Sequence, residues 1–229
     1  MEKTIEPFDF RQCINILEST GKHASNLREL RDLMATVSDE SIFHHVYQYF
    51  LKGHMLEYTN DFAQWIGETL EVSGLSERFS NTDPFAFKDF GELRSGLIAI
   101  IDEYLDKFPE PKDVLPGSEF YFNKTITMIF PAEIRVKNLA EFLIAVRYVD
   151  GSSIYYHFYE ARTRLGGRMD DFSRWFESAL GKKELADKLR DIDLFMHTIE
   201  GIRERIVEIV EEEVRKDMYG PVRVASVFT

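Results

Sequence analysis

The sequence predicts a predominantly helical α+β protein made of two tandem strand-plus-helices repeats, related by a pseudo-twofold axis and sharing a small β-sheet. The main observation is a repeated segment. Ser41–Tyr47 reads SIFHHVY, and residues 153–159, which lie 112 positions later, read SIYYHFY. The second observation is that apolar residues recur with helical spacing around both copies.

Each repeat begins with an alternating segment that predicts a half-buried strand. We expect these strands near residues 8–16 and 120–129, with Gly21 in a loop after the first. Because a single strand cannot satisfy its own backbone groups, the two strands are expected to pair with each other. The in-phase apolar residues are Phe8, Phe10, Ile14 and Ile16 in the first strand, and Phe120, Phe122, Ile126 and Met128 in the second.

The first helix of each repeat carries a capping-box pattern. Asn26 and Asn138 each precede a glutamate by three residues, so each asparagine is expected to cap a helix. The helix that follows carries the repeated SI-containing segment. We expect it to end at Gly53 in the first repeat and at Gly166 in the second.

A third helix is expected where NDFxxW at 60–65 matches DDFxxW at 170–175, now 110 positions apart. The acids of these motifs stand where a helix needs a cap. A stop at Gly181 and a short helix over 182–189 follow in the second repeat. The last helices are expected from Asp89 to about Leu105 and from Thr198 to about Val214.

Prolines at 109–118 predict a linker between the copies. We therefore expect one integrated domain, 1–229, made of repeats at about 8–108 and 120–216. The tail at 220–224 could form a third strand or a free end.

Composition excludes several classes of function. The 229-residue chain is 44% hydrophobic and 30% charged, which is ordinary for a folded protein, and its net charge of −12 argues against nucleic-acid binding. It has one cysteine, Cys13, no apolar run long enough for a membrane span, and acids within its N-terminal segment that argue against a signal peptide. The sequence therefore predicts a soluble cytoplasmic protein without a membrane or nucleic-acid partner.

The repeated histidines are the main candidates for a site. His45 and His157 are expected to face the interior, and Asp61 and Asp171 are the nearest matching carboxylates. Two histidines and two acids could meet at the pseudo-twofold as metal ligands or as an acid/base pair. The simpler interpretation is favoured, because the spacing lacks the short HxxxH or ExxH pattern of strong metal motifs. In it, each histidine is a core residue bound to a carbonyl or a tyrosine, and each aspartate is a helix cap.

Two further groups are weaker candidates. Tyr47 and Tyr159, with Trp65 and Trp175, could form aromatic walls for a sugar, although aromatics at helical spacing are more often core. A site confined to the first repeat could use three other side chains, which exposed positions explain equally well: His44, His54 and Glu57.

No signature of catalysis or of a cofactor is present. The chain lacks GxGxxG, GxxxxGK[ST] and GxSxG patterns, and Cys13 lies in a strand-like segment. We therefore expect no catalytic residues, no resident metal and no cofactor.

The repeated S-I-[FY]-x-H-x-Y and [ND]-D-F-x-x-W motifs resemble a prokaryotic domain family of unknown function. The resemblance extends over nearly the whole chain. It implies no catalytic residues, but members of the family can be appended to glycosyltransferase-type proteins. The resemblance therefore implies an accessory or regulatory role in carbohydrate metabolism.

The sequence thus favours a non-catalytic binding or regulatory module. Its partner would be another protein or a small polar ligand, and apolar surface between the copies could support a homodimer. The alternative is a small-molecule or metal-dependent enzyme that uses a site between the repeats.

Overall fold

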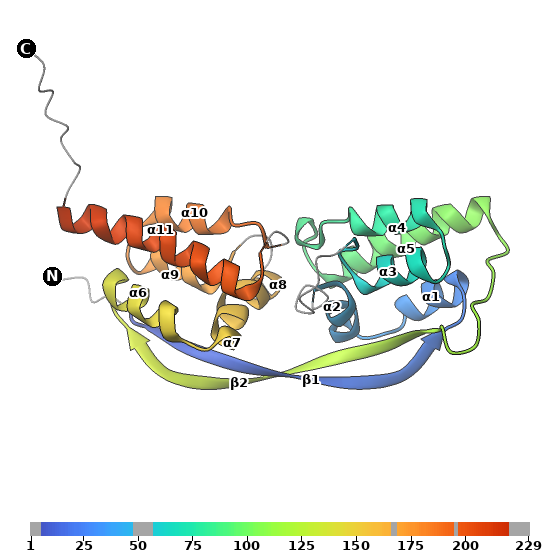
Figure 1. Ribbon diagram of the computed structural model, residues 1–229, viewed down its shortest axis with the longest axis horizontal. Helices are drawn as coiled ribbons and strands as arrows, with labels where there is room; N and C mark the ends of the chain where they lie inside the picture. Colours follow the sequence, from blue (N-terminus) through green and yellow to red (C-terminus); the bar gives the residue numbers. More distant parts are fainter. Residues whose placement is uncertain (1–5, 48–56, 166–168, 195–196, 220–229) are drawn as a thin grey trace, which may run out of the picture. The chain divides into compact units, whose positions relative to one another are not determined.

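Two 17-residue strands, β1 (Phe8–Ala24) and β2 (Phe120–Val136), pair in an antiparallel two-stranded sheet (Figure 1). The structure is a computed structural model that describes residues 6–47, 57–165, 169–194 and 197–219. The protein is α+β and mainly helical, as the sequence predicts. The expected ends of the second helix at Gly53 and Gly166, and the tail at 220–224, lie outside the described residues.

Each strand contributes its two ends to two different compact units. Unit 1 joins the chain up to Cys13 with the chain from Ile129 onward, and unit 2 runs from Ile14 to Met128. The first end of β1 therefore packs with the helices that follow β2. The units thus differ from the sequence repeats, because each unit takes its aromatic strand end from the other repeat.

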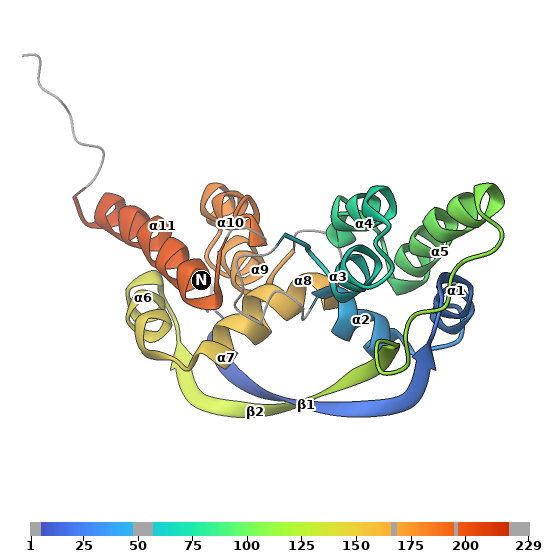
Figure 2. The ribbon, with the colours of Figure 1, turned by 45° about the vertical axis from the view of Figure 1, so that its right-hand side comes forward.

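The helices of unit 2 lie between β1 and β2 in the sequence, and those of unit 1 follow β2 (Figures 1 and 2). Those of unit 2 are α1 (Leu27–Met34), α2 (Asp39–Tyr47), α3 (Asp61–Glu68), α4 (Ser73–Ser80), the 3-10 helix η2 (Pro84–Ala86) and α5 (Phe90–Lys107). Those of unit 1 are α6 (Leu139–Tyr148), α7 (Gly151–Ile154), the π-helix η3 (Tyr155–Glu160), α8 (Ala161–Leu165), α9 (Asp171–Ser178), α10 (Lys183–Arg190) and α11 (Ile199–Tyr219).

The strands are longer than predicted, and their apolar face changes along their length. Gly21, which was expected in a loop, lies inside β1 with φ of 71°. The phenylalanines at the start of each strand are buried, but Ile14 is 57% and Ile16 45% exposed, and Ile126 and Met128 are also exposed. The prediction of one continuous buried face is therefore wrong. Alternation alone cannot show where the helices stop covering a strand.

Most expected helix starts are confirmed. Asn26 accepts a hydrogen bond from the Glu29 N–H at 2.9 Å, and Asn138 caps α6 in the same way. The glutamate side chain of each pair returns to the residue before the cap; Glu29 accepts from the Ser25 N–H at 2.8 Å. At α3 and α9 the caps are Asn60 and Asp170, one residue before the aspartates considered above.

The repeated histidine segment differs between the units. In unit 2 it lies on α2, and in unit 1 it continues from α7 through six residues of π-helix into α8. π-Helical turns are rare and occur often at functional sites. Nothing in the sequence pattern indicates this difference.

The turn after α3 and the matching turn after α9 each contain one residue with left-handed backbone, which is glutamate in unit 2 and glycine in unit 1. Glu71 has φ of 57° after α3, and Gly181 has φ of 70° after α9. Both follow a helix that is closed by the same bond, from Val72 N–H to Ile66 O in one case and from Lys182 N–H to Phe176 O in the other. Residues with a Cβ are strained in this conformation.

Glu71→Gly is therefore expected to raise the free energy of unfolding of unit 2 by up to about 1 kcal/mol. The reciprocal change Gly181→Glu is expected to lower stability by at least as much. A Cβ at Gly181 has no neighbour within 4 Å, so this loss would come from backbone strain alone. Urea denaturation of both variants checks the prediction; equal stability of Glu71→Gly and the unchanged protein would contradict it.

Among the described helices, none combines the length and the hydropathy that a membrane-spanning segment needs.

Candidate functional site

In unit 2, His45 joins three elements. It lies on α2, its Nδ1 is 2.8 Å from Oδ2 of Asp61 at the start of α3, and its Nε2 accepts a hydrogen bond from the Asn123 N–H of β2 at 3.0 Å. The side chain of His45 is only 3% exposed, and that of Asp61 12%. The ring therefore fixes two helices and a strand to one another.

In unit 1, His157 makes the same set of contacts. Its Nδ1 is 2.9 Å from Oδ2 of Asp171, and its Nε2 accepts from the Arg11 N–H of β1 at 2.7 Å. The side chains of His157 and Asp171 are 4% and 18% exposed. Each predicted histidine thus meets its predicted aspartate within its own unit. We propose that this agreement reflects the internal duplication that the sequence predicts.

The backbone contact decides the protonation of each ring. Because Nε2 accepts from a peptide N–H, it cannot carry a proton itself, so the neutral ring carries its proton on Nδ1 and donates it to the carboxylate. The partner of each ring is therefore an aspartate and a backbone N–H. The expectation of a carbonyl or tyrosine partner, and of the aspartates as caps, is wrong in this detail.

The electrostatics of unit 1 keep His157 neutral. Burial lowers the pKa of His157, although its hydrogen bond to Asp171 opposes the shift. Burial alone would raise the pKa of Asp171, but hydrogen bonds from His157 and Arg164 outweigh it and lower that pKa. Arg164 Nη2 lies 2.9 Å from Asp171 Oδ2. The aspartate therefore stays charged, and its proton donors are an imidazole and a guanidinium.

The predicted aromatic residues belong to the core. Tyr47 and Tyr159 are 5% and 0% exposed, and Trp65 and Trp175 are 8% and 6% exposed. Both indole N–H groups donate to backbone carbonyls at 2.8 Å. That of Trp65 donates to Ser118, and that of Trp175 donates to Glu6. These side chains hold strand ends in place and present no open aromatic wall.

His44 is buried as well, which corrects the expectation of an exposed side chain. It is 8% exposed, and its Nδ1 lies 2.9 Å from the Thr125 hydroxyl. In the described part of the chain, His44, His45 and Asp61 bring one possible ligand atom each to within 4.8 Å of one another. Of the other members of the proposed one-repeat site, His54 lies outside the described residues, and Glu57 is exposed.

The chemistry of this cluster does not fit a divalent cation. A histidine that binds a metal normally donates its second ring N–H to an acceptor. His45 Nε2 instead faces the N–H donor of Asn123, so a metal on Nδ1 would leave the ring without any proton. We therefore regard the cluster as a hydrogen-bonded core.

Two arginines that sequence reasoning missed close the first helix of each unit. Arg94 Nη1 donates to the carbonyls of Met34 and Val37, the latter at 2.7 Å. Arg203 Nη1 donates to the carbonyls at 146 and 149 at 2.7 and 2.8 Å. Such bonds satisfy carbonyls that a helix end leaves open. The signal in the sequence is that the two arginines recur 109 positions apart, as the last helices do.

A hollow with a volume of about 630 Å³ lies on unit 2 between α1, α5 and the residues after α5. Two of its charges are already paired: Arg31 makes two bonds to Asp102, at 2.8 and 3.1 Å. Arg28 donates to the Pro109 carbonyl at 2.6 Å. The hollow contains none of the predicted site residues, and its lining is Arg28, Arg31, Asp32, Asp102, Leu105, Asp106 and Pro109.

The fold is a two-stranded sheet with helices on its two ends, and each of its two units contains one buried histidine–aspartate pair. Residues 5–211 match the Family of unknown function (DUF5752), so the chain belongs to this family. A comparison with curated proteins finds no match. Among solved structures, the chain is similar to one described as "The structure of OrfY from Thermoproteus tenax". The two are 29% identical, with a TM-score of 0.78, over 92% of this chain and 97% of that one.

Proposed function

We propose that this protein is a non-catalytic binding or regulatory module that acts in carbohydrate metabolism. The observation that carries the proposal is the state of the two candidate histidines. Both ring nitrogens of each are bound within the fold, one to a carboxylate and one to a peptide N–H. A general base needs a nitrogen within reach of a substrate proton. We therefore assign both imidazole rings a structural role in the fold.

The hollow between α1 and α5 supports the binding role. Carboxylate and guanidinium groups on one surface can donate to and accept from the hydroxyl groups of a sugar or the charges of its phosphate. Its volume falls within the usual range of ligand pockets. The link to carbohydrates comes from the resemblance of the repeated motifs to domains appended to glycosyltransferase-type proteins.

The test is a thermal-shift and calorimetry panel of sugar phosphates and nucleotide sugars, with the ligand examined by NMR afterwards. The proposal expects saturable binding, recovery of the ligand unchanged, and at least tenfold weaker binding by Arg28→Ala and Asp106→Ala. Glu103→Ala on α5, outside the lining, is the matched control.

Conversion of a ligand, abolished in His45→Ala or His157→Ala variants that remain folded, would instead support the enzyme alternative. So would a stoichiometric metal ion that these variants lose. The absence of any binding across the panel would remove the proposed ligand class.

A further inference from the structure

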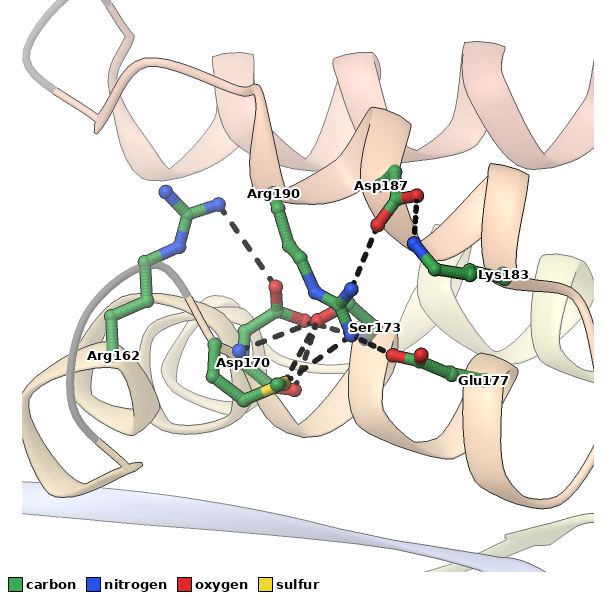
Figure 3. A network of polar contacts seen from close by, with 8 residues as sticks. Arg162, Asp170, Ser173, Glu177, Lys183, Asp187 and Arg190 are labelled. Atoms are coloured by element: carbon green, nitrogen blue, oxygen red, sulfur yellow. Dashed lines mark hydrogen bonds and ion pairs between the residues drawn. The ribbon is translucent and has the colours of Figure 1, made fainter.

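The carboxyl group of Asp170 is buried at the start of α9 with one oxygen left without a hydrogen bond. The residue is 0% exposed and caps the helix, since its Oδ1 accepts from the Ser173 N–H at 2.7 Å. In the part of the chain that the structure describes, Oδ2 has no hydrogen-bond partner. Among the described residues, Arg162 forms an ion pair with it, with Nη2 3.9 Å from Oδ2 (Figure 3).

Other contacts hold the Arg162 guanidinium at this distance. Its Nη1 donates to the Ile192 carbonyl at 3.1 Å and its Nη2 to the Leu189 carbonyl at 2.9 Å. Its central carbon also lies 4.5 Å from the centre of the Phe158 ring. A guanidinium anchored to two carbonyls and an aromatic face cannot turn freely toward the acid. The charged form of Asp170 therefore receives attraction but no hydrogen bond from it.

In unit 2 the matching helix cap is a neutral residue. Asn60, the cap of α3, accepts from the Ala63 N–H at 2.8 Å and donates from Nδ2 to the Phe79 carbonyl at 3.0 Å. Phe79 lies at the position that matches Leu189, whose carbonyl is bound by Arg162 in unit 1. The amide thus does in unit 2 what a buried ion pair does in unit 1, and it has no charge to gain or lose.

A buried carboxylate without its full set of hydrogen bonds is costly when it is charged. Burial raises the pKa of Asp170 from 3.8 to about 6, although the nearby Arg162 acts in the opposite direction. Because the folded pKa lies above the unfolded one, the folded state binds the proton more tightly. Stability from Asp170 is therefore present at low pH and is lost as the pH rises from about 4 through 6.

From this geometry we propose that Asp170 is a pH-sensitive latch at the start of α9. Its neutral carboxyl group stabilises the packing of α9 in unit 1, and its charged carboxylate weakens that packing. The device is confined to unit 1, because Asn60 occupies the matching position of unit 2.

Other ionisable groups around Asp170 also respond to pH, and the test must separate them. Burial raises the pKa of Glu160 to about 7, which acts in the same direction as Asp170. The lowered pKa values of His157 and Asp171 act in the opposite direction. The charged or titratable groups on the elements around Asp170 include Arg162 and Arg164 on α8, His157 and Glu160 on η3, Asp171 and Glu177 on α9, and Lys183, Asp187 and Arg190 on α10.

The test is amide hydrogen exchange of the full chain at pH 4.5 and 7.5, corrected for intrinsic exchange rates. The difference in α9 and α10 protection between the unchanged protein and Asp170→Asn isolates the latch. It is expected to change by roughly 25-fold between the two pH values, as a pKa shift from 3.8 to about 6 requires. Amides of α3 and α4 in unit 2 are expected to show no such difference.

Two further variants keep the test decisive. If Asp170→Asn does not fold because Arg162 loses its counter-ion, Arg162→Met with Asp170→Asn removes both charges and is expected to remove the same pH dependence. Glu160→Gln is the matched control and should leave the Asp170 contribution in place. An unchanged pH dependence in the Asp170 variants, or its complete loss in Glu160→Gln alone, would overturn the proposal.

Discussion

Replacing His157 by alanine is expected to lower the free energy of unfolding of unit 1 by about 3–5 kcal/mol. The ring packs between aromatic side chains, with centroid distances of 4.8 Å to Phe8 and 5.5 Å to Phe172. Its loss leaves a cavity there and removes the acceptor for the Arg11 N–H. It also removes one of the donors that keep Asp171 charged inside the protein.

Two comparisons make this result specific. His45→Ala is expected to cause a similar loss in unit 2, because His45 makes the same two kinds of contact. His23→Ala, at an exposed position of β1, should change stability by less than about 0.5 kcal/mol. Urea denaturation at pH 7.5 measures all three, and a loss below about 1 kcal/mol for His157→Ala would show that its ring is not bound as described.

The His157 contribution should also depend on pH. Its folded pKa is lowered below the ordinary value of 6.5, so the unfolded chain takes up a proton before the folded protein does. The stability due to His157 is therefore fully present above pH 6.5 and is lost as the pH falls through the folded pKa. The difference between the unchanged protein and His157→Ala should shrink on acidification below 6.5; a difference that grows would contradict the assigned tautomer.

Phe10→Ala is expected to destabilise unit 1 by about 3–5 kcal/mol, although the residue precedes every helix of unit 2 in the sequence. Its ring is 1% exposed and lies 5.7 Å from Phe142 and 5.8 Å from Phe172, measured between centroids. Removing it opens a cavity among side chains of α6 and α9. The cost of such a cavity depends on how far the surrounding helices can relax.

The two tryptophans allow each unit to be followed alone. Trp175 belongs to unit 1 and Trp65 to unit 2, and the chain has no others. In a Trp65→Phe background, denaturation monitored through Trp175 should shift by the full 3–5 kcal/mol in Phe10→Ala. Arg11→Ala, whose side chain is exposed on the same strand, is the matched control. An equal shift in both variants would contradict the prediction.

Much of the secondary structure could be predicted because its signals are local. Asn26, Asn138 and Thr198 act as caps, and Gly181 ends its helix, since these preferences depend on a few neighbouring residues. The pairing of the two strands also follows from a general requirement on backbone groups.

The packing partners of each strand could not be predicted in the same way. Phe10 and Phe122 occupy matching positions of the two repeats. Periodicity does not indicate whether a strand packs on the helices of its own repeat or on those of the other. The exposure of Ile14 and Ile16 has the same origin, because the helices of each unit cover only one end of each strand.

The candidate site was predicted in its members but not in its chemistry. Helical spacing and the repeat predict that His45 lies near Asp61 and that His157 lies near Asp171. The third partner of each ring is a peptide N–H, which no side-chain motif can indicate. The buried pair of Arg162 and Asp170 escaped prediction for another reason, because it occurs in one unit only.

The central claim is that each unit is completed by the strand end of the other repeat. Amide hydrogen exchange of Phe10→Ala and Phe122→Ala, both in the full chain, tests it most directly. The claim predicts that Phe10→Ala weakens protection in α6, α9 and α10 while α1, α3 and α4 keep theirs, and that Phe122→Ala does the reverse. Loss of protection in α1, α3 and α4 on replacing Phe10 would contradict it.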